Sequence, residues 1–270
     1  MLGPTFGNTQ TDNRMKHILS SLILAAAAVT LVGCAQTAQP GRSTPLAENL
    51  SDVGFLGDIY PKMTAGKDGE SLLLYRNPKF DSAASFVRYT KVMLEPIKLY
   101  AGADSPLQNT PKEQTTAIVQ GFYNQLHEQL AKDYQMVDKA GPDTLQISVA
   151  VIDALASDTS AKAASYIPIP LGLPGAKAAA MQATSQTTGK PPFSGQVTVE
   201  GKMSDAQTGE VISAGIDRRV GARRPIVGLF ESSTYDAWSD VTAAERYWAE
   251  LLRYRLCLRR GASNCVKPAQ

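Results

Sequence analysis

Residues 196–220 read QVTVEGKMSDAQTGEVISAGIDRRV, and this stretch decides the fold class. In its first half, apolar and polar residues alternate with the period of a β-strand. Asp205–Gly209 has the composition of a turn, and its glycine can supply the positive φ that hairpin turns need. The stretch therefore predicts a β-hairpin whose second strand covers Glu210–Val220.

Two stretches upstream of the hairpin predict further strands. Leu145–Val151 alternates apolar residues with polar or small ones, which predicts a half-buried strand. Val92–Leu94 is a short apolar run of the kind found in buried strands. Pro96 follows it and is expected at an edge or bulge of the sheet, because proline cannot donate to a strand ladder.

Two other stretches predict helices, each with a capping box at its start. Thr110 is expected as an N-cap, with Pro111 at the first helical position and Glu113 reaching back. This helix should run to about Tyr134. Thr242 and Glu245 form the second capping box, and Gly261 can end the closing helix. The apolar faces consist of Ile118, Phe122, Leu126 and Leu130 in the first helix and of Tyr247, Trp248, Leu251 and Leu252 in the second.

These elements together predict one α+β domain over residues 52–270. Strands separated by helices, plus a hairpin, favour a mixed, mostly antiparallel sheet with two main helices packed on it. The length of 270 residues and the 43% hydrophobic content agree with this and exclude wholesale disorder. Residues 157–194 interrupt the pattern as an insert that either contacts a partner or lipid, or packs over the sheet.

A cleavable signal is expected ahead of the domain. Lys16 precedes the apolar run Ile18–Val32, which has the length of a secretory signal rather than of a membrane span. The run leads into Leu31-Val32-Gly33-Cys34, which resembles the lipobox of bacterial lipoproteins. There the cysteine thiol receives a diacylglycerol, a peptidase cuts before it, and the new amine is acylated.

The lipobox resemblance sets the expected organisation of the N-terminal region. Residues 15–33 form the lipoprotein signal peptide, and residues 1–14 are interpreted as an upstream extension. Cys34 carries the covalent lipid, and residues 34–51 form a flexible tether rich in small and polar residues. Two or three acyl chains anchor a protein firmly. Because Ala35 rather than aspartate follows the cysteine, the resemblance implies the outer membrane, with the domain facing the periplasm.

Charge excludes some classes of partner. The chain has 27 basic and 25 acidic residues, so it lacks the basic excess typical of a nucleic-acid binder. Beyond the N-terminal region, no apolar run is long enough for a polytopic membrane protein. One cluster stands out, formed by Arg218, Arg219, Arg223 and Arg224. It is either an anion or partner contact at a strand end, since arginine forks bind carboxylate and phosphate, or a solvated loop.

Catalytic motifs are missing from the sequence. His127 has no HExxH context, and no G-x-S-x-G elbow or phosphate-binding loop is present. We therefore predict no catalytic residue, no metal site and no cofactor other than the lipid. Carboxylates such as Asp133, Asp138 and Asp143 are scattered as on a solvated face, although folding can still bring two acids together.

Several segments resemble an uncharacterised family of bacterial lipoproteins, domain of unknown function 3313. The resemblance runs from about Asp52 to Leu256, and Ile59-Tyr60 departs from the Tyr-Ser usual in the family. It implies an envelope lipoprotein and no particular reaction. The matching segments are Val53–Leu56 with Asp58, Leu74–Pro78, Tyr89–Pro96, Gly141–Leu145, Val149–Asp153, Ala214–Gly221 and Trp248.

Two functional hypotheses follow from the sequence. The first is a non-catalytic binding or assembly module in the cell envelope, whose partner is another envelope protein, peptidoglycan or an anionic lipid. The second is a periplasmic small-substrate hydrolase with carboxylates brought together by folding. A deep pocket with paired acids would favour the hydrolase.

Cys257 and Cys265 are predicted to form a disulfide. With Cys34 acylated they are the two remaining thiols, and export places them in an oxidising compartment. Cys257 lies in the last turn of the closing helix, and Gly261 lets the chain turn back toward it.

Overall fold

The computed structural model describes residues 37–39, 54–102, 105–157, 194–221 and 237–269, all within one compact unit that spans Ala35–Gln270. The predicted signal peptide, the predicted lipobox and nearly all of the 157–194 insert lie outside these residues. Within them, no helix is long and apolar enough to span a membrane.

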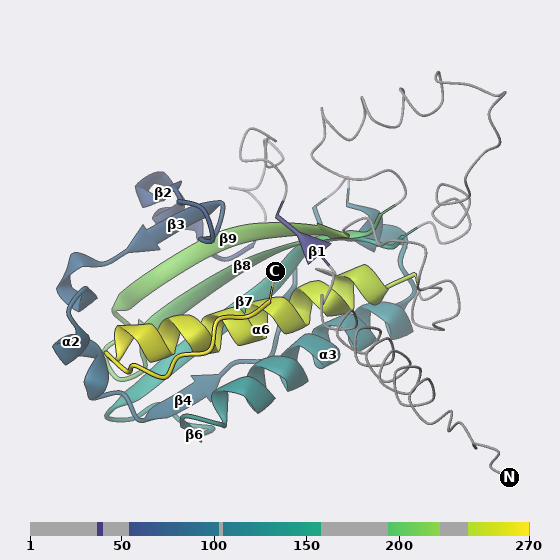
Figure 1. Ribbon diagram of the computed structural model, residues 1–270. Helices are drawn as coiled ribbons and strands as arrows, with labels where there is room; N and C mark the ends of the chain where they lie inside the picture. Colours follow the sequence, from purple (N-terminus) through teal and green to yellow (C-terminus); the bar gives the residue numbers. More distant parts are fainter. Residues whose placement is uncertain (1–36, 40–53, 103–104, 158–193, 222–236, 270) are drawn as a thin grey trace, which may run out of the picture. The chain divides into compact units, whose positions relative to one another are not determined.

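A nine-stranded mixed sheet carries the fold (Figure 1). Its main path runs β2-β3-β9-β8-β7-β4-β6, with β1 added to β9 and β5 to β7. Pairing is antiparallel from β2 through β7 and parallel around β4, β5 and β6. The strands are β1 Thr37–Ala38, β2 Thr64–Ala65, β3 Leu73–Arg76, β4 Lys91–Leu94, β5 Lys98–Leu99, β6 Gln135–Met136, β7 Thr144–Leu155, β8 Gln196–Asp205 and β9 Val211–Gly221.

The predicted α+β class is confirmed, and so is the hairpin. β8 and β9 pair across a turn in which Gly209 has φ +73°. The helices and helical turns are η2 Gly57–Lys62, η3 Pro78–Phe80, α2 Ala83–Val87, η4 Pro106–Asn109, α3 Lys112–Leu130 and α6 Ser239–Arg259.

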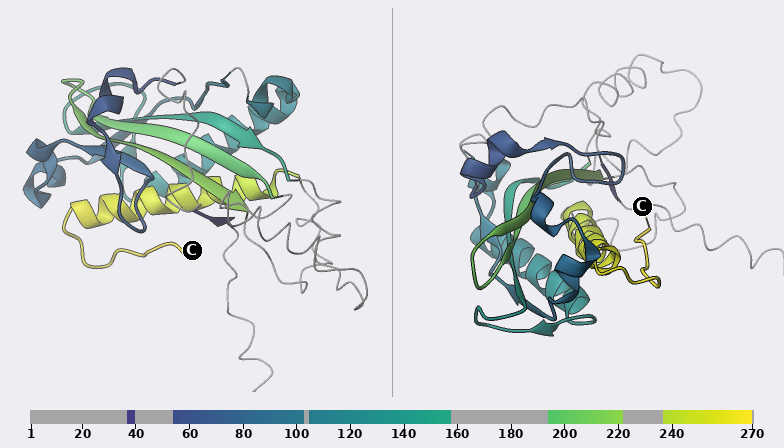
Figure 2. Two further views of the ribbon diagram at one scale, coloured as in Figure 1. Left: turned by 90° about the horizontal axis from the view of Figure 1, so that it is seen from above. Right: turned by 90° about the vertical axis from the view of Figure 1, so that its left-hand side faces the viewer.

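The two long helices cover one face of the sheet (Figure 2). The predicted apolar face of α3 is buried against α6 and strands β4, β7 and β8 in the main core. Gly57–Lys62 and the residues just before it cover the opposite face. There Leu56 packs with Ala150, Ile152 and Ile216 in a second, smaller core.

This second core corrects the interpretation of β7 as half-buried. Nine of the twelve residues of Thr144–Leu155 are buried, because helices cover one face of the strand and the chain around Leu56 covers the other. Sequence alternation predicts which residues share a face, but it does not reveal a short covering segment far away in the chain.

Both predicted capping boxes are wrong. Thr110 ends the helical turn η4, where its hydroxyl donates to the carbonyl of Pro106 at 3.1 Å, and α3 begins after Pro111 without a side-chain cap. It ends at Leu130, four residues earlier than expected. Helix α6 begins at Ser239, so Thr242 lies inside it and Glu245 is buried rather than capping. Packing set both starts, overriding the local cap signals.

Part of the predicted tether is also structured. Thr37 and Ala38 form β1, which pairs antiparallel with the end of β9 through Gly221 and Val220. A polar composition does not prevent pairing when a neighbouring edge offers unpaired backbone groups. The expectation of a fully flexible tether over residues 34–51 therefore fails at residues 37–39.

Candidate functional site

A cleft opens between helix α6 and the β3–β9 side of the sheet. It holds a cavity of about 520 Å³, within the usual range for small-molecule sites. The sheet side of the cavity is lined by Ser213 and Gly215 of β9 and by Leu74 of β3. Ser213 and Gly215 are small, so they leave space between the sheet and α6. The deep part is apolar and is lined by Phe122, Leu126, Val149, Val199, Trp248 and Leu251.

Three arginines stand at the cleft: Arg76 from the end of β3, and Arg255 and Arg259 one turn apart on α6. Arg76 pairs with Glu70 at 2.6 Å. Arg255 donates to the carbonyl of Gly69 at 2.5 Å. The guanidinium of Arg259 lies 4.6 Å from the ring centroid of Phe86, and its Nη1 is buried without a hydrogen-bond partner in the described part of the chain.

The electrostatics of these arginines are unfavourable for their charged forms. Burial lowers the pKa of Arg255, and the charge of Arg76 lowers it further, although Asp217 and Glu70 oppose this. Burial also lowers the pKa of Arg259, as do the charges of Arg76 and Arg255. Among the described residues, neither Arg255 nor Arg259 forms an ion pair with a carboxylate.

Four acids line the cleft, Asp68, Glu70, Glu200 and Asp217, and fixed donors hold Glu70 and Asp217. Asp217 accepts from Trp248 Nε1 at 2.7 Å and from Gln39 Nε2. Glu70 accepts from Arg76 and from the backbone N–H of Lys67. Burial raises the pKa of Asp217, while the donors of Glu70 outweigh its partial burial and lower its pKa.

Two other glutamates are fully buried but lie far from one another in the architecture. Glu200 of β8 is 0% exposed and accepts the N–H of Phe55 on the second-core face; burial raises its pKa to about 7. Glu245 of α6 faces Gly121 of α3, and burial raises its pKa to about 8. Raised pKa values are typical of general acids. The sheet separates these two acids, however, so they do not form a catalytic pair.

The predicted arginine cluster is not a single surface patch. Arg219 is 4% exposed, donates to the hydroxyl and carbonyl of Thr37 at 2.8 and 2.7 Å, and stacks 3.6 Å from the ring centroid of Tyr247. Arg218, on the other face of β9, donates to Thr198 at 3.0 Å. Both lie in a strand rather than in a solvated loop. Arg223 and Arg224 fall outside the described residues.

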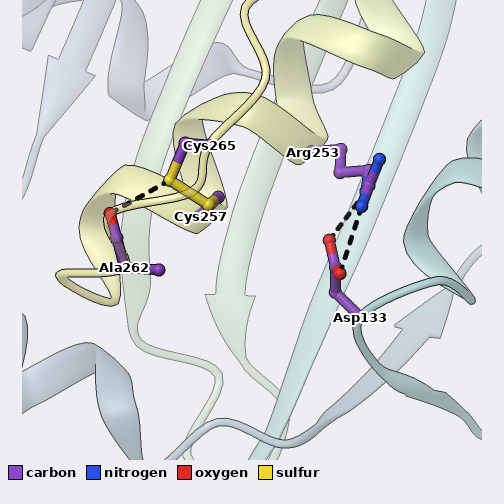
Figure 3. Close-up of a disulfide and its surroundings, with 5 residues drawn as sticks. All are labelled: Asp133, Arg253, Cys257, Ala262 and Cys265. Carbon is purple, nitrogen blue, oxygen red and sulfur yellow. Dashed lines mark hydrogen bonds and ion pairs between the residues drawn. A yellow bond between two sulfur atoms is a disulfide. The ribbon is translucent and has the colours of Figure 1, made fainter.

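The other predicted site residues are placed as follows. Cys257 and Cys265 are joined in a disulfide with a Cα separation of 5.6 Å (Figure 3). The Cys265 sulfur lies 3.2 Å from the carbonyl of Ala262, but an oxidised sulfur has no proton to donate there. Leu31, Val32, Gly33 and Cys34 lie outside the described residues. No group of three metal-binding side chains occurs among the described residues.

Sequence reasoning missed the cleft arginines. One signal was present, because positions four apart on a helix share a face and Arg255 and Arg259 have that spacing. The partners of these residues come from β3 and from residues 67–71, however, so only folding reveals the cluster.

Comparison with known proteins now identifies the family. The profile described as "Protein of unknown function (DUF3313)" matches residues 51–252, three quarters of the chain. The chain belongs to the DUF3313 family. The match covers the whole sheet after β1 and the first two thirds of α6, and it ends before the cleft residues Arg255 and Arg259. No curated protein matches the chain.

Solved structures give weaker likenesses to this DUF3313 protein. A point-mutant PelC dodecamer from Paraburkholderia phytofirmans has 12% identity and a TM-score of 0.33, covering 71% of this chain and 96% of that one. A putative neuraminyllactose-binding hemagglutinin homolog from Helicobacter pylori has 8% identity and a TM-score of 0.31, covering 75% and 92%.

Proposed function

We propose that this DUF3313 protein is a lipid-anchored protein of the bacterial cell envelope whose domain is a non-catalytic binding module. Cys34 carries the lipid, and the anchor holds the protein at the outer membrane with the domain in the periplasm. The lipobox Leu31–Cys34 and the signal run before it support the anchor and the compartment.

The observation that carries the binding role is the α6 cleft. It combines an apolar interior with a few fixed polar groups, as ligand sites usually do. Of the acids that line it, Glu70 and Asp217 both accept hydrogen bonds from fixed donors. A hydrolase of the carboxylate type needs two acids facing one substrate. The donors that hold Glu70 and Asp217 favour binding over hydrolysis.

Photo-cross-linking in cells tests the binding role. A photo-reactive amino acid replaces Leu258, which lines the cleft and is 50% exposed. The matched control is Leu99 on β5, which is 37% exposed and does not line the cleft. We expect adducts on the peptide carrying position 258 and none at position 99, measured by mass spectrometry of the digested chain. Equal labelling at both positions, or none at 258, would contradict the proposal.

A further inference from the structure

We propose that the α6 cleft binds a monoacyl anion: a single hydrocarbon chain in the apolar interior and a carboxylate or phosphate head at Arg255 and Arg259. This inference rests on the proposed function, because it names the ligand class of the same cleft. It commits to one occupant, an acyl lipid from the surrounding membrane. Three features of the cleft carry it.

The first feature is positive charge without a direct ion pair. Arg76 pairs with Glu70, whereas neither Arg255 nor Arg259 has an ion pair among the described residues; Asp217 and Glu70 act on Arg255, and Asp81 acts on Arg259, only through their charge. Half-buried guanidinium groups near one another favour binding of an anion, because an anion restores charge balance where water is partly excluded. The planar fork of arginine matches carboxylate and phosphate oxygens.

The second feature is an unused donor. Nη1 of Arg259 is buried without a partner among the described residues, and the same guanidinium is held in place over the ring of Phe86. A buried donor without an acceptor costs free energy, so an acceptor at this position is stabilising. An anionic oxygen is the strongest acceptor that could occupy it.

The third feature is the apolar interior next to this charge. The cavity of about 520 Å³ runs between α6 and the sheet and is bordered by Phe122, Leu126 and Leu251. A free inorganic anion would leave this surface empty, whereas a neutral hydrocarbon would leave the arginines unmatched. A chain with one anionic end satisfies both parts.

The chain contains a built-in probe for this site. It has two tryptophans: Trp248 lines the cleft, while Trp238 lies outside the cleft lining and donates to Gln114. In a Trp238→Phe variant of the full chain, kept in a neutral detergent, Trp248 is the sole tryptophan. We expect 9,10-dibromostearate to quench its fluorescence saturably. In the matched Trp248→Phe variant, the Trp238 signal should change no more than it does with detergent micelles alone.

Three further binding measurements test whether the ligand needs an anionic head group. The double change Arg255→Gln with Arg259→Gln should weaken stearate binding at least about tenfold, as expected from the loss of charge-assisted hydrogen bonds. Arg253→Gln is the control on the same helix, because Arg253 pairs with Asp133 instead. The methyl ester of dibromostearate should bind at least about tenfold more weakly to the protein with both arginines intact, because it lacks the anionic head. Inorganic phosphate should not displace the bound acid.

Opposite results overturn the inference. Ester binding as tight as acid binding would show a purely apolar site, and displacement by inorganic phosphate would show an anion site without a chain. Absence of quenching would exclude the acyl ligand. If position 258 still gives cross-links in that case, the binding module stands with another ligand class; if both tests fail, the cleft is not a binding site.

Discussion

At the scale of single residues, Glu200 is a buried acid with a local conflict. Its carboxyl is fully buried under the chain segment around Phe55, and one of its oxygens has no partner in the described residues. The hydroxyl of Tyr60 is also buried without one, and burial together with Glu200 raises its pKa. Burial, which disfavours the charged carboxylate, raises the pKa of Glu200.

Glu200 should make stability depend on pH. Its pKa is about 7 in the folded chain against an ordinary value of 4.5, so the folded state binds the proton more tightly. This contribution is complete below pH 4.5 and is lost as pH rises through about 7. The change Glu200→Gln should remove that loss and stabilise the protein at pH 8 by at most about 3 kcal/mol.

Urea unfolding of both proteins at about pH 5 and about pH 8, on either side of the folded pKa, measures the effect of Glu200→Gln. Glu245→Gln is a useful comparison, because Glu245 has a raised pKa with the same sign but lies between the helices. An unchanged pH slope in the Glu200 variant would show that this carboxyl is not the titrating group.

Gly54 should tolerate no side chain. Its φ is +101°, and a Cβ added there would lie 2.0 Å from Glu200 Oε1. We expect Gly54→Ala to lower the free energy of unfolding by about 2–4 kcal/mol, from backbone strain and the clash together. Gly57→Ala is the matched control, because no atom lies within 4 Å of its added Cβ, and it should change stability by less than about 0.5 kcal/mol. Similar losses in both variants would contradict the clash.

At the scale of elements, helix α6 contributes side chains both to the main core and to the lining of the cleft. On this helix, Trp248 donates a hydrogen bond to Asp217 of β9, and the ring of Tyr247 stacks on Arg219. Arg253 forms an ion pair with Asp133, which follows α3 (Figure 3). The disulfide then fixes the chain that follows α6, including Lys267, which lines the cleft. One helix therefore positions both the core contacts and the cleft arginines.

The disulfide should stabilise this end of α6 by a modest amount. Its sequence separation is 8, and the chain-entropy account for so short a loop gives roughly 2–3 kcal/mol. Cys257→Ser with Cys265→Ser should lower the unfolding free energy by about that much. Mass spectrometry of the non-reduced, alkylated protein should find the two cysteines linked within one chain. Finding both alkylated, or linked between two chains, would contradict this.

At the scale of the whole molecule, the first residues that the structure describes lie directly on the folded domain. Arg219 holds Thr37 through two hydrogen bonds, and β1 completes the edge of β9. Since Cys34 is three residues before Thr37, the proposed lipid attachment lies close in sequence to the sheet. The predicted tether is therefore fixed to the domain soon after it begins.

Cys34→Ala should abolish membrane anchoring. Without the thiol no diacylglycerol is added, and the peptidase that acts on the lipidated cysteine leaves the precursor uncut. Incorporation of labelled palmitate and the mass of the product in cell fractions measure this. Cys265→Ser is the control and should remain acylated. Palmitate uptake by the Cys34→Ala variant would show that the lipobox assignment is wrong.

The sequence alone determined the α+β class, the hairpin, the buried face of α3 and the pairing of Cys257 with Cys265. These features depend on local periodicity, turn chemistry and short chain separation, which can be read from neighbouring residues. The burial of Glu200 and the meeting of Arg76 with Arg255 and Arg259 were decided only by the tertiary structure. They join segments more than a hundred residues apart, and no local pattern encodes such contacts. Helices α3 and α6 do not begin at the residues that their cap signals predicted. The reason is related, because the packing of a whole amphipathic face outweighs a single cap.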